Sequence, residues 1–556
     1  MTALPKIPDL ADLPESERTP TVIALHAICT QQQEQLVKQQ EQLVKQQEQL
    51  VKQQEQIHLL KEQVQGLKDE IARLKGHKPK PKIKPSTLDK GGGTQGGEGK
   101  RPGSAKRRKA LEIHETVKVP PAHVPPGSRF KGYEDFTVQD IILKPHNTVY
   151  RLERWVTADG QPLVGKLPKE AGDGHFGTTL VSFILYQYYH CHVTQPLIWE
   201  QLVDLEVDIS TGQVNRIITE GKEVFHQEKA EILRVGLAVS RYVHVDDTTA
   251  RHQGKNGYCT HVGNELFAYF ESTGSKSRIN FLEVLRGDHR DYVISDVALD
   301  FMRAQKLPQD HLEHLCAHQG HRFEGKEVWK ALLWFLGITD ERHVRIATEG
   351  ALLGSVLDHG VNPELAIMSD DAGQFNLVLL LHVLCWIHAE RLLAKLVGFN
   401  DEQREDLERV RGQVWDLYQI LKLYKQSPSE VLKAEVSERF DAIFTQQTRF
   451  ETLNQALKRL HRNKSELLAV LDHPELPLQN NLSEGDIRDY VKKRKISGST
   501  RSDDGRRCRD TFASVKKTCR KLGVSFWSYL KDRVSGLNII APLSEIIRQR
   551  AQEAFE

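Results

Sequence analysis

Residues 242–249 read Tyr-Val-His-Val-Asp-Asp-Thr-Thr, a short apolar run that ends in two adjacent carboxylates. Two alternating runs follow, Tyr258-Cys-Thr-His-Val and Leu266-Phe-Ala-Tyr-Phe, with a turn signal at Gly263 and Asn264 between them. Consecutive alternating runs joined by short turns predict a β-meander. We therefore expect a sheet whose first strand presents an acidic pair at its end.

A second acidic pair follows a later run. Leu365-Ala-Ile-Met-Ser is strand-like and ends in Asp370 and Asp371, just as the first run ends in Asp246 and Asp247. Acids at the ends of two apolar strands can present carboxylates to a divalent metal, and these hard oxygen ligands suit Mg²⁺ or Mn²⁺. A single aspartate at a strand end is more often a turn or cap residue. The presence of two such pairs weakens that alternative.

A third acid, Glu484, lies in Gln-Asn-Asn-Leu-Ser-Glu-Gly-Asp-Ile-Arg at residues 479–488. Ser483 and Glu484 open a predicted helix after a proline-containing loop, and Arg488 lies four residues later on the same face. From Arg488 to Arg533, fifteen Lys and Arg stand against five acids. An acid flanked by this positive charge suits a site that handles phosphodiesters. The alternative is a surface carboxylate on a helix.

Charge is distributed unevenly along the chain. Its 556 residues include 77 Lys and Arg and 75 Asp and Glu, so the net charge is only +2, which excludes a uniformly basic protein. Residues 76–110 nevertheless hold eleven Lys and Arg against two acids, in a segment rich in Pro and Gly. This composition predicts a disordered basic linker that tracks DNA phosphates. The alternative is a linker that is simply solvated.

The N-terminal region repeats with a period of seven. Glu-Gln-Leu-Val-Lys-Gln-Gln occurs three times between Glu34 and Gln54, and one heptad register extends over residues 22–75. The core positions of that register are Val22, Leu25, Cys29, Gln32, Leu36, Gln39, Leu43, Gln46, Leu50, Gln53, Ile57, Leu60, Val64, Leu67, Ile71 and Leu74. An unbroken register predicts a coiled coil, and its C-terminal Ile/Leu seam favours a parallel dimer. An isolated polar helix is the alternative, but it would expose the seam.

Cysteines and apolar runs indicate the compartment. The seven cysteines are widely spaced and form no Cys-x-x-Cys pair, so we expect reduced thiols rather than a disulfide framework. No apolar run approaches the roughly 18–20 residues of a membrane span. The N-terminus has no apolar secretory signal. These features favour a cytoplasmic protein that does not associate with membranes.

Two smaller regions precede the first acidic pair. Residues 111–170 carry strand-like runs at 136–143 and 148–156 and a turn at Ala158-Asp-Gly-Gln, which predict a small β module. Residues 171–237 read as helical. Within them, the helix from Pro196, a short turn and a capped helix from Thr211 form a helix-turn-helix candidate for reading DNA. The alternative is an ordinary helical pair that packs on the next domain.

Two further motifs complete the pattern of acids. They are Cys385-Trp-Ile-His-Ala-Glu-Arg391 and Asn480-Asn-Leu-Ser-Glu-x-x-x-Arg488, with Arg494-Lys495 beyond them. In this order the motifs resemble the insertion sequence 66 transposase family. The Cys-Trp-x-His segment and the Asn-Asn-x-x-Glu-x-x-x-Arg helix are the most specific matches. The resemblance covers most of the chain, with a core from about residue 178 to 535.

The segment around the second acidic pair also resembles another group. Ser369-Asp-Asp-Ala-Gly-Gln-Phe looks like the second-acid segment of retroviral-type integrases, and that analogy favours Asp370 over Asp371. An apolar helix is predicted over residues 377–396. On it we expect Cys385 and Trp386 to pack in the core and His388 to face the site.

The family resemblance implies an α/β RNase H-like catalytic core, a mixed five-stranded sheet flanked by helices. Asp246, Asp370 and Glu484 would bind two Mg²⁺ or Mn²⁺ ions, with Asp247 and Asp371 as second choices. One ion would activate water or a DNA 3′-hydroxyl, and the other would stabilise the leaving oxygen. The residues expected to bind DNA phosphates are Arg488, Arg494, Lys495, Lys492, Lys493, Arg391 and His388.

The resemblance also implies a layout in which a coiled coil, a basic linker and a small β/helical DNA-binding region precede the core. The expected segments are a tail (1–21), the coiled coil (22–75), the linker (76–110), a cysteine-free counterpart of the family's zinc module (111–170), the helix-turn-helix-like region (171–237), the first part of the core (238–390) with an insertion (286–345), a helical insertion (391–475) and the second part of the core with the basic C-terminal region (476–556).

The insertion at 286–345 holds a string of metal-ligand residue types, His311, His314, Cys316, His318 and His321. Soft and borderline ligands within a few turns are the pattern of a zinc site. A His-rich segment that binds no metal is the alternative.

The resemblance therefore implies a Mg²⁺-dependent DDE-type transposase of an insertion sequence. It would bind the element's terminal inverted repeats and target DNA, and cleave and join strands. The expected partners are double-stranded DNA, a second copy of the chain and small accessory element-encoded proteins. The expected location is the bacterial cytoplasm, with the nucleoid. The alternatives are an RNase H-like nuclease or resolvase without strand joining, and an inactive transposase-derived DNA-binding protein, although the retention of all three acids argues against the last.

Overall fold

The computed structural model describes residues 112–168 and 174–553, with a few single positions between 14 and 30. Most of the predicted coiled coil and the whole basic linker therefore lie outside the described residues. The chain divides into two units, residues 1–134 and 135–556. In the first unit, residues 112–134 are exposed and hold no helix or strand.

The predicted β module is only partly present. One hairpin forms, from β1 (Arg154–Val156) and β2 (Pro162–Val164), and it turns where the sequence predicts. The strand predicted at 136–143 is wrong, because those residues are exposed and outside any ladder. Phe136 and Ile142 are 90% and 82% exposed, so nothing packs against this segment to support a strand. A two-stranded hairpin without a buried face is only marginally stable.

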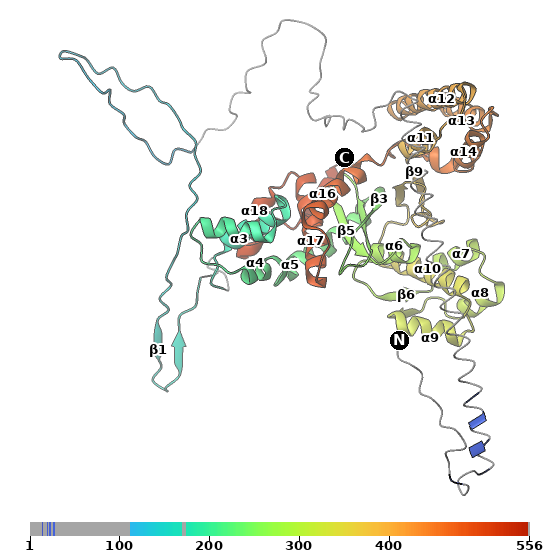
Figure 1. Cartoon of the computed structure of the whole chain (residues 1–556), viewed down its shortest axis with the longest axis horizontal. Coiled ribbons are helices and arrows are strands. Elements are labelled where there is room, and N and C mark those ends of the chain that lie inside the picture. The colour runs from blue at the N-terminus through green and yellow to red at the C-terminus, as the bar shows by residue number, and fades with distance from the viewer. Residues whose placement is uncertain are drawn as a thin grey trace. The chain divides into compact units, whose positions relative to one another are not determined.

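The second unit is built on a mixed five-stranded sheet in the order β5-β4-β3-β8-β9 (Figure 1). Its strands are β3 (Tyr242–Thr249), β4 (Tyr258–Gly263), β5 (Ala268–Thr273), β8 (Ala366–Ser369) and β9 (His382–Leu384). The first three form the predicted antiparallel meander, and β8 and β9 run parallel to β3. A meander followed by two parallel strands is compatible with an RNase H-like core.

Helix α17 (Asp503–Lys521) covers the outer edge of this sheet. Asp510, Ser514 and Thr518 accept hydrogen bonds from the backbone N–H groups of β5 at 2.8, 2.9 and 3.2 Å. Acceptors four residues apart on a helix repeat about every 6.0 Å, and the donors of an edge strand repeat about every 6.6 Å. The two spacings match, so the helix satisfies an edge that would otherwise be open to another strand.

A helical layer precedes β3. It contains α2 (Thr178–Leu185), the π-helix η5 (Tyr186–His190), α3 (Gln195–Asp204), α4 (Thr211–Thr219) and α5 (Glu223–Val239). The helical character predicted for this region is confirmed. Three later helices pack with this layer, namely α17, α18 (Phe526–Ser535) and α19 (Leu543–Glu553). The first and last parts of the second unit therefore share one hydrophobic core.

The segment between β5 and β8 is helical with a two-stranded sheet. Its elements are α6 (Arg278–Arg286), β6 (Asp291–Val293), α7 (Asp296–Ala304), α8 (Gln309–Cys316), β7 (Arg322–Glu324), α9 (Lys326–Phe335) and α10 (Glu341–Asp358). Strands β6 and β7 pair antiparallel, a feature that the sequence did not predict.

The segment after β8 corrects one expectation. The apolar helix predicted over 377–396 is instead a loop, strand β9 and the shorter helix α11 (Trp386–Ala394). The sequence predicted a helix here because strand β9 is buried at every position and so lacks the alternation of apolar and polar residues that marks a strand.

The following helices have a core of their own, in which Trp386 is anchored by its indole N–H donating to Leu467 O at 2.9 Å. They are α12 (Asp401–Gln426), α13 (Glu430–Thr445), α14 (Glu451–Arg462), α15 (Lys464–Leu467) and the 3₁₀ turn η6 (Ala469–Leu471). The chain then returns to the sheet through α16 (Asn481–Ser497). Among the described residues, no helix is both long and apolar enough to cross a bilayer.

Candidate active site

The parallel pairing of β3 with β8 brings the two acidic pairs level. Tyr242 pairs with Ala366 and His244 with Met368, and the same register carried two residues further sets Asp246 beside Asp370. Successive side chains of a strand point to opposite faces, so Asp246 shares a face with His244. The two first acids of the pairs are therefore neighbours at one end of the sheet.

Helix α16 is held against that same face. Asn480, which precedes the helix, lies with its Oδ1 2.8 Å from His244 Nδ1 and donates from Nδ2 to Val245 O at 2.9 Å. On β4, His261 pairs with Asp246 and its Nδ1 lies 2.7 Å from Ser483 Oγ. These contacts fix the first turn of α16, which carries Glu484, over the carboxylate of β3.

Asp246 lies in a crowded acidic environment. Burial is the largest cause that raises its pKa to about 6; the carboxylates of Asp370, Asp247 and Glu484 add to this effect, and the Asp247 N–H bond at 2.7 Å opposes it. The electrostatic influence of Asp370 and Glu484 on Asp246 indicates that these three carboxyl groups lie close together. Repulsion of this kind is relieved by a divalent cation.

Asp247 points to the other face of the strand. It accepts hydrogen bonds from Thr260 Oγ1 at 2.6 Å and from Gln374 Nε2 at 3.1 Å. Burial raises its pKa, while those two bonds and the Lys276 ammonium lower it. Because its oxygens are already engaged, Asp247 is the weaker candidate ligand of the pair.

The second acidic pair divides in the same way. Asp370 Oδ1 accepts only a local bond, from Ala372 N–H at 3.2 Å, among the contacts of the described residues. Asp371 is bound by Arg459, whose Nε lies 2.9 Å from Oδ2, and by Asn463 Nδ2 at 3.2 Å. Asp371 thus ties the loop after β8 to α14, which leaves Asp370 for the site.

Glu484 is surrounded by two arginines and a histidine from α11 and α16. Arg391 of α11 approaches it at 2.8 and 3.4 Å, His388 Nε2 at 3.6 Å and Arg488 at 3.7 Å. Its side chain is only 17% exposed. Burial lowers the pKa of His388, whose Nδ1 is buried without a hydrogen-bond partner in the described part of the chain. The expectation that His388 faces the site matches this geometry.

Asp486, two residues beyond Glu484, has a different role. It lies 3.2 Å from His261 Nε2, 2.9 Å from Lys521 and 3.5 Å from Lys517. Burial alone would raise its pKa, but the contacts with His261 and with the Lys521 ammonium hold the pKa well below its usual range. The carboxylate therefore neutralises buried cations between α16 and α17, and it is not a rival metal ligand.

The basic residues of α16 point in different directions. Arg488 is 75% and Lys492 67% exposed, and Lys495 is exposed as well. Arg494 donates to Thr248 Oγ1 at 3.2 Å and to Thr249 Oγ1 at 2.7 Å, beside the end of β3. Lys493 corrects an expectation, because it is buried, donates to Tyr188 O at 2.7 Å and lies over the Tyr188 ring. It does not present its ammonium to a phosphate.

Several residues of the site were not singled out from the sequence. They are His244, His261 and Gln374. Asn480 belongs to the Asn-Asn-x-x-Glu-x-x-x-Arg motif, but its side chain does not cap α16 and instead bonds His244 and Val245 of β3, a contact that the motif alone does not indicate. The buried histidines of β3 and β4 carried no signal in the sequence either, since their hydrogen-bond partners depend on which helix packs over them.

The donor set fits a hard divalent ion. Asp246, Asp370 and Glu484 offer only carboxylate oxygens, which Mg²⁺ and Mn²⁺ prefer. The ligand atoms of these three residues do not all lie within 4.8 Å of one another. In the described part of the chain, one other group of residues does meet that distance. A wider spacing suits carboxylates that repel one another and that would share two ions roughly 3.5–4 Å apart.

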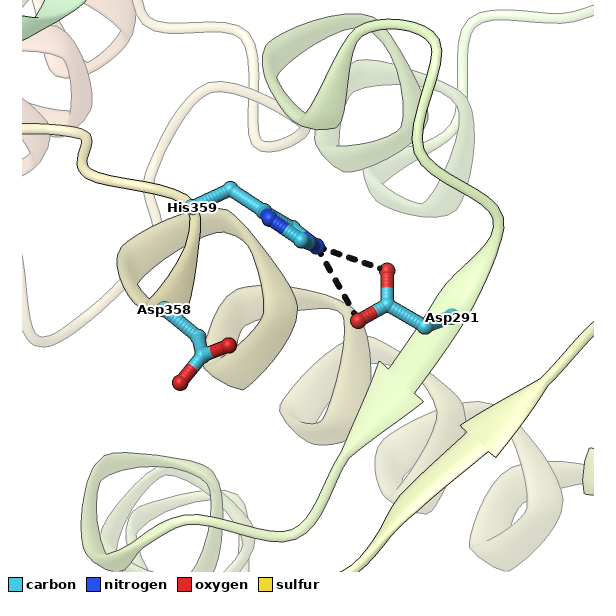
Figure 2. Close-up of side chains that lie close together, drawn as sticks. All are labelled: Asp291, Asp358 and His359. Carbon is cyan, nitrogen blue, oxygen red and sulfur yellow. Dashed lines mark hydrogen bonds and ion pairs between the residues drawn. The ribbon is translucent and has the colours of Figure 1, made fainter.

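That other group is Asp291, Asp358 and His359, at the junction of β6 with the end of α10 (Figure 2). His359 Nε2 lies 2.9 and 3.0 Å from the two oxygens of Asp291. Arg322 is 3.3 Å from Asp291 and also pairs with Asp358. The guanidinium already compensates both carboxylates, so the cluster fastens the insertion to the end of α10.

The predicted zinc string is not assembled. Within the described residues, His311, His314, Cys316, His318 and His321 contribute no set of three ligand atoms within 4.8 Å. The ring of His311 lies against His343, and His321 Nδ1 lies 3.1 Å from His318 O. The string runs along α8 and out of it, so its members point in different directions.

The helix-turn-helix candidate is present as α3 and α4, but its charge does not suit DNA. Residues 195–223 hold six acids and two Lys or Arg. Val214, Ile217 and Ile218 of α4 are buried against neighbouring helices. The placement favours the alternative of a helical pair that packs on the next domain.

The strand order and the three acids at one sheet end are compatible with an RNase H-like, metal-dependent enzyme of nucleic acids. Comparison with known proteins agrees: the family model described as "Transposase IS66 family" matches residues 357–507, a range that includes Asp370 and Glu484. The uncharacterized protein y4jO of Sinorhizobium fredii is 43% identical over 324 residues, which are 58% of this chain and 100% of that protein. The chain belongs to the IS66 transposase family.

Proposed function

We propose that the protein is a DNA transposase that cleaves and joins strands at the ends of a mobile element, with Asp246, Asp370 and Glu484 as its catalytic carboxylates. The β3–β8 register, which carries Asp246 and Asp370 to the same end of the sheet, is the observation that supports this most strongly. Membership of the family points to the same class of reaction.

The three carboxylates would hold two Mg²⁺ or Mn²⁺ ions, which in such sites activate the attacking oxygen and stabilise the leaving one. Asp246 is the central ligand, since it lies between Asp370 on the neighbouring strand and Glu484 on α16. Asn480 and Ser483 keep α16 seated on β3 and β4, so that Glu484 stays aligned.

The basic groups around the carboxylates suit a phosphodiester substrate. Arg391 and Arg488 lie beside Glu484, and His388 Nε2 lies 3.4 Å from Arg391 NH1 and 3.6 Å from Glu484. Guanidinium groups bind phosphates in a forked geometry. In this proposal they hold the scissile phosphate while His388 keeps the carboxylate of Glu484 in place.

A strand-transfer assay tests the proposal. The donor is a duplex that carries one inverted repeat from the DNA flanking the gene and ends in a free 3′-hydroxyl, and the target is a supercoiled plasmid in Mg²⁺. Joined donor–target product is the expected result. Cleavage of donor DNA without joining would indicate a nuclease or resolvase. Neither product, with DNA binding retained, would indicate an inactive relative.

A further inference from the structure

The β3–β4 hairpin continues beyond the acidic end of β3 and ends in a basic tip, residues 251–256. The tip is a tight turn with Gln253 at φ 48° and Gly254 at φ 76°. His252 and Lys255 exchange backbone hydrogen bonds of 3.0 and 2.9 Å. Arg251 and Lys255 are exposed, and the six residues include no acid.

The tip is fastened to a segment nearly 250 residues away in the sequence, the loop between α16 and α17. Gln253 N–H donates to Thr500 O at 2.8 Å, and Thr500 N–H donates to Arg251 O at 3.3 Å. His252 Nδ1 also lies 2.8 Å from Thr500 Oγ1. Because backbone groups of both segments are bonded, the tip has a defined position.

Cationic side chains lie on the tip, on the attached loop and in the last turn of α16. We call Arg251, Lys255, Lys495 and Arg501 the hairpin surface; all four are exposed. Two acids, Asp503 and Asp504, open α17 beside these four cations, and Asp503 is already paired with Arg506 at 2.9 Å and with His252 Nε2 at 3.2 Å. The hairpin surface therefore carries an excess of positive charge.

Its position relates it to the candidate active site. Asp246 and Arg251 lie on one continuous chain segment, about five residues or roughly 16 Å apart at the rise of a strand. That distance corresponds to about five nucleotide steps along a duplex. Arg494, which donates to Thr249 Oγ1 at 2.7 Å, bridges the interval.

We infer that the hairpin surface binds the phosphate backbone of double-stranded DNA that flanks the cleaved bond. The inference rests on the proposed function and extends it, because it assigns a DNA-contact surface to residues outside the catalytic carboxylates. Phosphate contacts of this kind position a duplex and carry no sequence information.

The test measures the salt dependence of binding to a duplex of about 30 base pairs, roughly three helical turns, of arbitrary sequence. Full-length protein is compared with the double variant Arg251→Gln/Lys255→Gln by fluorescence anisotropy in EDTA. Each phosphate contact contributes about 0.9 to the slope of log K against log salt, so the double variant is expected to lower the slope by about 1.8. The affinity in 0.1 M salt then falls about 60-fold if the two curves meet at 1 M salt.

The matched control is Arg548→Gln/Arg550→Gln, which removes two exposed cations from α19. It is expected to leave the slope unchanged, and both double variants should keep the thermal midpoint of the wild type. An unchanged slope for the Arg251→Gln/Lys255→Gln variant, with normal binding by the wild type, overturns the inference and leaves the proposed function standing. A wild-type chain that binds no DNA overturns the proposed function itself.

Discussion

Arg391 of α11 and Glu484 of α16, 93 residues apart in the sequence, form an ion pair in which NH1 lies 2.8 Å and NH2 3.4 Å from the carboxylate oxygens. The pair joins the Cys-Trp-x-His segment to the helix of the third acid. Glu484 raises the pKa of Arg391 by accepting its hydrogen bond. In a metal-binding site, a cation bound to a ligand carboxylate competes with the metal.

We expect Arg391→Gln to strengthen Mn²⁺ binding. Arg391 is 46% exposed, so solvent weakens its hold on Glu484, and pairs of that kind contribute up to about 1 kcal/mol, or roughly fivefold in affinity. Isothermal titration of metal into the full chain measures the change. The same variant should cleave DNA more slowly, since it loses a phosphate contact. Weaker metal binding in the variant would contradict the competition.

Replacing Glu484 by Gln keeps its shape and removes its charge. We expect Mg²⁺-dependent cleavage and joining to fall at least ~10²-fold, in line with the loss of a group that stabilises the transition state. DNA binding in EDTA should persist, as measured by anisotropy. The control is Glu475→Gln, a half-exposed acid 3.7 Å from His473. Near-normal cleavage by Glu484→Gln would show that α16 presents a different ligand.

Asp486 does not serve as a neutral control for Glu484, although it lies only two residues further along α16. Its carboxylate balances the ammonium groups of Lys517 and Lys521 in a buried network that also contacts His261. Removing one partner of such a network leaves uncompensated buried charge. We expect Asp486→Asn to lower the thermal midpoint of the protein, whereas Glu484→Gln should leave it nearly unchanged. Differential scanning fluorimetry of both variants separates the two roles.

The two aspartates after β8 should behave differently. Asp370→Asn is expected to abolish cleavage, because Asp370 is level with Asp246 in the sheet register. Asp371→Asn keeps its shape at an exposed ion pair with Arg459, so the change in stability should stay within about 0.5 kcal/mol and cleavage should remain near normal. Cleavage rates of the two variants on one DNA substrate decide this. Faster cleavage by Asp370→Asn than by Asp371→Asn would require that the register of β8 against β3 be shifted by one residue.

Lys493 should destabilise the protein at neutral pH. Burial, with Arg509 and Lys516 nearby, lowers its pKa to about 7, against about 10.4 in an unfolded chain. The loss of folding free energy caused by burying this ammonium is therefore complete below pH 7, and it disappears as the pH rises toward 10. We expect Lys493→Met to raise the thermal midpoint at pH 7 and the gain to shrink by pH 9.5. Lys492→Met, at the exposed neighbouring position, should change little at either pH.

Self-association through residues 22–75 stays a prediction, since most of that segment lies outside the described residues. Light scattering of the full chain should give a dimer, and a truncated chain that starts at Lys78 should give a monomer. The unbroken heptad register is the reason. A monomeric full-length chain at micromolar concentration would exclude the coiled-coil dimer.

The sequence by itself identified the parts of the site that depend on local patterning. Alternation predicted the meander β3–β5, acids at the ends of apolar runs marked Asp246 and Asp370, and helix-start signals located Glu484 in the first turn of α16. These features are readable because strand alternation and helix capping act between residues that are close in the sequence.

Only the tertiary structure shows which residue of each acidic pair is engaged by neighbouring side chains. The β3–β8 register and the contacts of Asp371 with Arg459 and Asn463 join segments far apart in the sequence, and no local pattern encodes them. The burial of Lys493 under Tyr188 is of the same kind, because a basic run looks uniform until packing divides its helix into faces. The strand predicted at 136–143 was wrong for the converse reason: local propensity was present, but no partner surface buries it.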